Sequence, residues 1–175
     1  MRKGRVVAVV VTVAVLVVAG TIAYRFMMKP ELDGPDAIGI QVEKNIRAVY
    51  QIQSGEKRGE VAAGLHHLKK LVDTYDRLGV DSSQRHLHGV FHGDAGHFLL
   101  EDEAYSRETG AQGENPNRSL VEELEDRGVH LELCARTMQA HGWGEQNVLD
   151  EVAIVVGAYP RVIDLQLSGY AYVRF

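Results

Sequence analysis

Cysteine is nearly absent from this 175-residue chain, whose only cysteine is Cys134. One cysteine cannot form an internal disulfide bond, so no disulfide framework holds the fold together. Glycine-rich nucleotide-binding fingerprints, nucleophile elbows and cysteine pairs with zinc-site spacing are also missing. These absences argue against a nucleotide-binding enzyme, a hydrolase of the nucleophile-elbow type and a cysteine-ligated zinc protein, and we expect no cofactor.

Positive charge is scarce over most of the chain. Residues 30–175 hold 14 basic and 24 acidic side chains, a net charge of −10, whereas the whole chain carries −5. A surface of this sign repels phosphate backbones, so we expect no nucleic-acid partner. The remaining basic residues all precede Pro30, where no acid occurs: Arg2, Lys3, Arg5, Arg25 and Lys29.

A long uncharged segment lies among these basic residues. Residues 6–23 carry no charge and would span roughly 27 Å as a helix, close to the hydrocarbon thickness of a bilayer. We predict a membrane anchor at residues 1–24, because the apolar part of a signal peptide usually stops at about 7–15 residues. The alternative is a signal peptide cleaved near Thr21 and Ala23.

The charges that flank this segment predict its orientation. Three basic residues precede it, and the two that follow are accompanied by the acids Glu31, Asp33 and Asp36, which favours a cytoplasmic N-terminus. We therefore expect a single-pass inner-membrane protein whose folded domain faces the periplasm. If the segment is cleaved, we expect an exported periplasmic protein.

Residues 25–44 predict a linker, because they hold two of the four prolines, several acids and little periodicity. The folded domain is expected over residues 45–175. Its strands and helices alternate, which predicts an α/β domain with three α/β/α layers around a five-stranded, mostly parallel sheet. Expected strands cover 46–53, 87–92, 129–133, 152–156 and 170–175. Expected helices cover 60–78, a stretch that follows Gly93-Asp94-Ala95-Gly96 and runs through Tyr105, 115–128, 135–141 and 160–168.

Two local details of this pattern can be tested. In the segment "NPNRSLVEELEDRG", Asn115 is expected to cap a helix and Pro116 to occupy its first turn. A single expected helix connects the last two strands. Its direction, parallel or antiparallel at an edge of the sheet, is left open by the sequence.

Polar residues follow the ends of the expected strands. In an open parallel sheet, ligands bind beyond the carboxyl ends of the strands, so these residues are expected to share one edge. They are Gln53 and Ser54; His92, Gly93 and Asp94; Cys134; and Gly157, Tyr159 and Arg161.

Cys134 is expected where a strand passes into a helix. The partial positive charge of the helix start and the nearby Arg136 favour the thiolate, which is the nucleophilic form. The alternative is that Cys134 is an inert core residue, since cysteine is among the most buried residue types.

Other residues at this edge allow more than one role. His92 and His97 beside Asp94 could serve acid–base chemistry or the structure, and we expect no metal because no close pair has convincing ligand spacing. Tyr159 is expected to pack. Arg161 either fixes an oxyanion or pairs with an acid such as Asp164.

Four segments of the chain resemble the DsrE-like family, which includes sulfur-relay subunits of the DsrE and TusD type. They are "VFHGDAGHFLLEDEAY" (90–105), "NPN" (115–117), "GVHLELCARTMQAHGW" (128–143) and "VVGAYPRVIDLQLSGYAYVRF" (155–175). The resemblance covers nearly all of residues 45–175. It implies a three-layer α/β fold, a homo-oligomer, and a persulfide carried on the cysteine that Cys134 matches.

Two hypotheses follow. In the first, Cys134 accepts sulfur from a donor protein and passes it to an acceptor, with support from His92, Asp94, Arg136, Tyr159 and Arg161. In the second, the domain is a non-catalytic, membrane-anchored module that binds a small ligand or forms oligomers, and Cys134 is structural. The apolar C-terminal segment "LQLSGYAYVRF" suits an edge strand buried against a neighbouring subunit.

Overall fold

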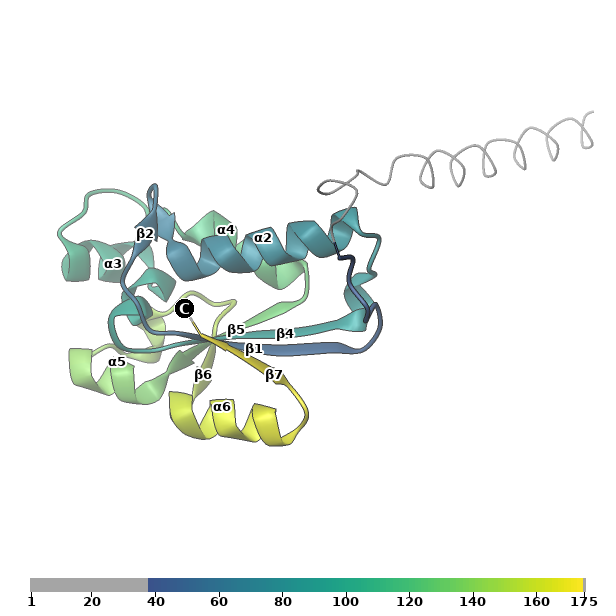
Figure 1. Ribbon diagram of the computed structural model, residues 1–175. Coiled ribbons are helices and arrows are strands. Elements are labelled where there is room, and N and C mark those ends of the chain that lie inside the picture. The colour runs from purple at the N-terminus through teal and green to yellow at the C-terminus, as the bar shows by residue number, and fades with distance from the viewer. Residues whose placement is uncertain (1–37, 175) are drawn as a thin grey trace, which may run out of the picture. The chain divides into compact units, whose positions relative to one another are not determined.

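The computed structural model describes residues 38–174 (Figure 1). The predicted membrane anchor and the first part of the predicted linker lie outside these residues. Residues 38–45 are exposed and form no helix or strand, and the first strand begins at Ile46. Within residues 38–174, no helix is long and apolar enough to cross a bilayer.

A five-stranded parallel sheet forms the centre of the domain. The order of its strands is β6-β5-β4-β1-β7, and every neighbouring pair is parallel. The prediction of a five-stranded, mostly parallel sheet is confirmed, and the last strand is parallel to its neighbour. The bounds are β1 (Ile46–Ile52), β4 (Arg85–Phe91), β5 (Val129–Cys134), β6 (Ala153–Val155) and β7 (Ala171–Arg174).

Helices lie on both sides of this sheet (Figure 1). One side carries α2 (Ala63–Arg77), α3 (Asp102–Thr109) and α4 (Arg118–Asp126), and the other carries α5 (Ala135–His141) and α6 (Ala158–Leu167). Successive strand residues face opposite sides. Accordingly, Ile52, Phe91 and Leu133 pack in the core beneath α2, whereas Val49, Val90 and Cys134 pack against α6.

The expected helix at 60–78 begins later than predicted. A short antiparallel hairpin, β2 (Lys57–Arg58) and β3 (Val61–Ala62), precedes it, and α2 starts at Ala63. Gly59 has a φ of +65° at the hairpin turn, a conformation that glycine adopts without strain. Val61 therefore belongs to an extended segment and not to the helical face on which its spacing had placed it.

The stretch after Gly96, which the sequence predicts to be helical through Tyr105, is not one helix. It contains the end of a 3₁₀ segment, η2 (Gly93–Leu99), followed by α3 from Asp102. Leu100 is extended between them and forms an isolated bridge with Val148, which interrupts the helical run. Two shorter 3₁₀ turns complete the described elements: η1 (Ser82–Gln84) and η3 (Glu145–Asn147).

The prediction that Asn115 caps a helix is wrong. The residue at the N-cap of α4 is Asn117, so Pro116 precedes the helix. The Asn115 amide donates instead to the backbone carbonyls of Phe98 at 3.0 Å and Leu100 at 2.6 Å. Its side-chain oxygen accepts the backbone N–H of Asn117 at 3.0 Å, and this bond closes a turn just before the helix and not the first turn of α4.

Candidate functional site

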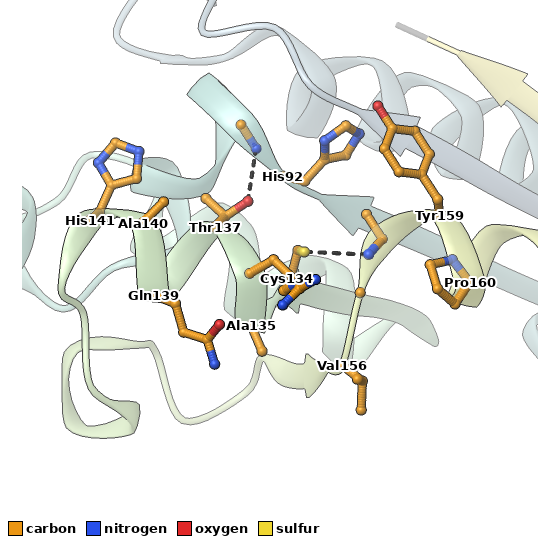
Figure 2. A pocket seen from close by; sticks show the side chains of 14 residues that line it. His92, Cys134, Ala135, Thr137, Gln139, Ala140, His141, Val156, Tyr159 and Pro160 are labelled. Atoms are coloured by element: carbon orange, nitrogen blue, oxygen red, sulfur yellow. Dashed lines mark hydrogen bonds between the residues drawn. The ribbon is translucent and has the colours of Figure 1, made fainter.

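The carboxyl ends of β4, β5 and β6 open into a pocket of about 910 Å³ (Figure 2). Because these strands are parallel, the segments that follow them meet at one edge of the sheet. The lining residues come from those three segments: His92 and Gly93; Cys134, Ala135, Arg136, Thr137, Gln139, Ala140 and His141; and Val156, Gly157, Ala158, Tyr159 and Pro160.

Cys134 ends β5 and lines this pocket, although only 4% of the residue is exposed. Its Sγ accepts a hydrogen bond of 3.3 Å from the backbone N–H of Ala158, the first residue of α6 (Figure 2). The first N–H groups of a helix have no partner within the helix, so this group is available to the sulfur. The sulfur thus has a backbone donor on one side and the cavity on another.

His92 lies one position beyond β4, and Cys134 is the last residue of β5, where it pairs with Val155 of β6. The Gln51 amide nitrogen is 2.9 Å from His92 Nε2, and the Gln51 carbonyl accepts from the Tyr172 hydroxyl. An amide nitrogen only donates, so His92 Nε2 accepts and the neutral ring carries its proton on Nδ1. Burial, and to a smaller degree Arg174, lowers the pKa of His92, which favours this neutral form.

Tyr159 and Arg136 also line the pocket. Tyr159 is 61% exposed, and its ring meets the His92 ring edge to face at 5.4 Å between centroids. Arg136 is exposed and forms no hydrogen bond or ion pair with the residues at 38–174. None of the fourteen lining residues is Asp or Glu, although the chain as a whole is acidic. The pocket therefore contains a cation and no carboxylate among its lining residues.

Asp94 lies in a second pocket of about 310 Å³, which shares only Gly93 and His141 with the first. In this pocket, Glu108 binds His141 Nδ1 at 2.8 Å and Trp143 Nε1 at 3.1 Å. Over residues 38–174, no three His, Cys, Asp or Glu side chains are grouped so as to hold a metal ion.

Arg161 does not line either pocket. Its guanidinium forms two parallel bonds of 2.8 Å with the carboxylate of Glu132, while Asp164 is 3.9 Å away. Glu132 is only 3% exposed and also accepts from His88 Nδ1 at 2.7 Å. Burial alone would raise the pKa of Glu132, but the hydrogen bonds from His88 and Arg161 lower it to about 2. Glu132 is therefore a buried, fully paired carboxylate.

Sequence reasoning missed Glu132, His88, Gln51 and Tyr172. The strand sequence "VHLELC" contained a signal for one of them. Side chains alternate along a strand, so Glu132 shares the face of Cys134, two residues away. The Gln51–Tyr172 contact had no such signal, because it depends on β7 pairing with β1 across 121 residues of sequence.

Solved structures of other proteins share this fold. A protein of unknown function from Methanobacterium thermoautotrophicum has 20% sequence identity and a TM-score of 0.54, and the match covers 74% of this chain and 99% of that one. The ychN protein from E. coli has 18% identity and a TM-score of 0.52, with 74% and 100% covered. At these identities the likeness concerns the fold alone.

The sequence comparisons give a narrower result. No curated protein matches the chain. A model of the DsrE/DsrF-like family matches residues 82–175, which are more than half of the chain and include β4, β5, α5 and α6. The chain therefore belongs to the DsrE/DsrF-like family.

Proposed function

We propose that this protein carries sulfur as a persulfide on Cys134. Membership of the DsrE/DsrF-like family supports a role in sulfur relay in general. The main support for a persulfide on Cys134 is the environment of its thiol. Cys134 Sγ borders a cavity and accepts the N–H of Ala158, a donor that stabilises a negatively charged sulfur.

The chemistry requires two exchange steps at sulfur. The Cys134 thiolate attacks the outer sulfur of a donor persulfide, R–S–SH, forming a new S–S bond while the donor's S–S bond breaks. The donor leaves as the thiolate R–S⁻, and Cys134 holds the outer sulfur as Cys–S–S–H, the protonated form that a second thiolate can attack. An acceptor thiolate then attacks this outer sulfur and releases Cys134 as a thiolate, so there is no net oxidation.

The residues around the pocket have distinct roles in this proposal. Arg136 attracts the anionic donor, because it is unpaired and no carboxylate lines the cavity. The Nδ1–H of neutral His92 donates to a bound sulfur species, and the exposed Tyr159 ring forms the wall against which the donor rests. Asp94, in the neighbouring pocket, is left without a direct role in sulfur binding.

Sulfur loading tests the proposal. The purified protein is incubated anaerobically with glutathione persulfide, freed of excess reagent and weighed by intact mass spectrometry. We expect a gain of one sulfur atom in the wild type and none in Cys134→Ser, whose hydroxyl cannot form a persulfide. Adding an acceptor thiol should remove the sulfur from the wild type.

The serine variant is nearly isosteric, and its thermal unfolding should match that of the wild type closely. A wild type that takes up no sulfur while remaining folded would contradict the proposal. Equal uptake by Cys134→Ser would contradict it as well, because the sulfur would then lie elsewhere.

One observation favours a second role, self-assembly. On the outer face of α6, the apolar side chains of Ile163 and Leu167 are exposed at helical spacing. Exposed contiguous apolar surface is typical of protein interfaces. We propose that a second copy of the chain covers it, which is compatible with sulfur transfer but would also serve a non-catalytic module.

A further inference from the structure

The ion pair between Glu132 and Arg161 links the two segments that meet at Cys134. Glu132 precedes Cys134 by two residues on β5, so both side chains face α6. Arg161 follows Ala158 by three residues, which places it about one turn into α6. One partner of the pair is thus fixed to the strand that carries the thiol, and the other to the helix that supplies its N–H donor.

We propose that Glu132 and Arg161 are positioning residues: their ion pair clamps the first turn of α6 so that the Ala158 N–H stays on Cys134 Sγ. The biological purpose of this clamp rests on the proposed function, because the clamp serves to keep the Cys134 thiolate ready for sulfur transfer. It assigns to Arg161 a role that acts through Ala158 and not through contact with the bound sulfur.

The geometry of the pair suits a clamp. Arg161 Nε binds one oxygen of Glu132 and Arg161 Nη2 the other, both at 2.8 Å, so the guanidinium can neither rotate nor slide without breaking a bond. The remaining contacts of α6 with the sheet beneath it include Val162 and Leu165 against Val49 and Val90. Such apolar contacts are non-directional, so they fix the position of a helix less sharply than a bidentate ion pair does.

The carboxylate itself is held firmly. His88 Nδ1 donates to Glu132 Oε1 at 2.7 Å, and the His88 ring contacts the rings of His130 and Tyr170. Glu132 therefore has a fixed position from which to hold Arg161. A shift of α6 of even a fraction of an ångström would lengthen the 3.3 Å contact between Ala158 and the sulfur.

The rate at which iodoacetamide alkylates Cys134 in the folded protein tests the clamp. Charge alone and positioning predict different results for two variants. If only charge matters, Arg161→Gln removes a cation and slows the reaction, whereas Glu132→Gln removes an anion and speeds it. If the clamp matters, both variants release Ala158, and both react about tenfold more slowly near neutral pH, as for a lost hydrogen bond to a charged group.

Two further variants complete the design. Arg161→Lys keeps the charge but not the paired donors, and we expect an intermediate rate. Arg127→Gln removes an arginine that pairs with Asp73, Asp76 and Glu123 on the opposite side of the sheet, and its rate should equal that of the wild type. The pH profile of alkylation should move to higher pH in both clamp variants and stay unchanged in Arg127→Gln.

The outcomes separate the clamp from the proposed function. Faster or unchanged alkylation of folded Glu132→Gln overturns the clamp while leaving sulfur transfer on Cys134 intact. A wild-type thiol that does not react until the protein unfolds overturns both. Thermal unfolding identifies any variant that has lost its fold. If Glu132→Gln or Arg161→Gln is unfolded, the alkylation rate of Arg161→Lys provides the test. A rate equal to that of the wild type overturns the clamp.

Discussion

At the scale of single residues, Glu132 shows how the site combines burial with charge. Taking a carboxylate out of water is costly unless it is paired. Three bonds, two from Arg161 and one from His88, offset this cost and lower the pKa of Glu132 to about 2 in spite of its burial. These bonds hold Glu132 in its charged form and fix the position of its carboxylate.

The pKa of Glu132 predicts how stability depends on pH. Its folded-state value of about 2 lies below the ordinary value of 4.5, so the carboxylate stabilises the fold above pH 4.5 and loses that contribution as the pH falls toward 2. The full contribution is on the order of 3 kcal/mol. The difference in unfolding free energy between the wild type and Glu132→Gln, measured by urea denaturation, should therefore shrink between about pH 7 and about pH 3.5.

An exposed carboxyl provides the matched control for this measurement. Glu122 lies on the solvent side of α4, and Glu122→Gln should differ from the wild type by a similar small amount at both pH values. A Glu132→Gln difference that is constant over the same range would show that Glu132 is not selectively stabilised as a carboxylate in the fold.

Several residues of the pocket could be predicted from the sequence. His92 and Tyr159 follow strands and Cys134 ends one, and the ends of parallel strands meet at one edge whatever the strand order. The partner of Arg161 could not be chosen in this way. The sequence suggested Asp164 because it lies three residues further along the same helix. The structure instead pairs Arg161 with Glu132, which the packing of α6 on β5 brings close.

At the scale of elements, two buried asparagines tie three segments together. Asn117 accepts the N–H of Ala62 at 2.7 Å and donates to Asn115, whose amide bonds the carbonyls of Phe98 and Leu100. The hairpin, η2 and α4 thus share one hydrogen-bond network. Both asparagines are almost fully buried, so no water replaces a lost bond easily.

Asn115→Ala should consequently destabilise the fold by about 2–4 kcal/mol, because it leaves two buried carbonyls and the Asn117 amide without their partner. The midpoint of urea unfolding measures the effect. Asn147→Ala, which removes a single part-buried bond to Gly144, should cost about 1 kcal/mol and serves as the control. Equal effects of the two substitutions would show that the network adds nothing.

The sequence predicted most elements but not the interruptions between them. Periodicity located α2, α4, α5 and α6, because their apolar faces repeat along the helix. It could not reveal that Leu100 pairs with Val148 or that Asn115 bonds neighbouring carbonyls. Both features arise from segments that are distant in the sequence and therefore leave no local pattern.

At the scale of the whole molecule, the exposed apolar face of α6 predicts self-association. Leu167 is 85% exposed and Ile163 55%, on a helix whose opposite side is buried in the core. Light scattering on the purified full-length protein should give a multiple of the monomer mass. Leu167→Glu, which places a charge in the proposed interface, should shift the protein toward the monomer.

The neighbouring residue offers a matched control for this shift. Gln166 is exposed on the same helix, and Gln166→Glu adds the same charge without changing the apolar face. Its mass in solution should equal that of the wild type. A wild type that is monomeric at all concentrations would contradict self-association.

The architecture of the whole domain was predictable because alternating strands and helices leave few alternatives to a parallel sheet. The prediction of five strands is confirmed. The direction of β7 was not predictable, since its partner β1 lies at the other end of the domain sequence. The family resemblance is confirmed by the match over residues 82–175.

The central claim is that Cys134 carries sulfur, and its most direct test is the mass of the native protein. The protein is purified anaerobically from the cells that make it, and its intact mass and the peptide containing Cys134 are measured. The account predicts a population heavier by one sulfur atom, with that atom on Cys134 and removable by an added thiol. A Cys134 found only as the unmodified thiol, in protein that also fails to take up sulfur from a persulfide donor, would contradict the account.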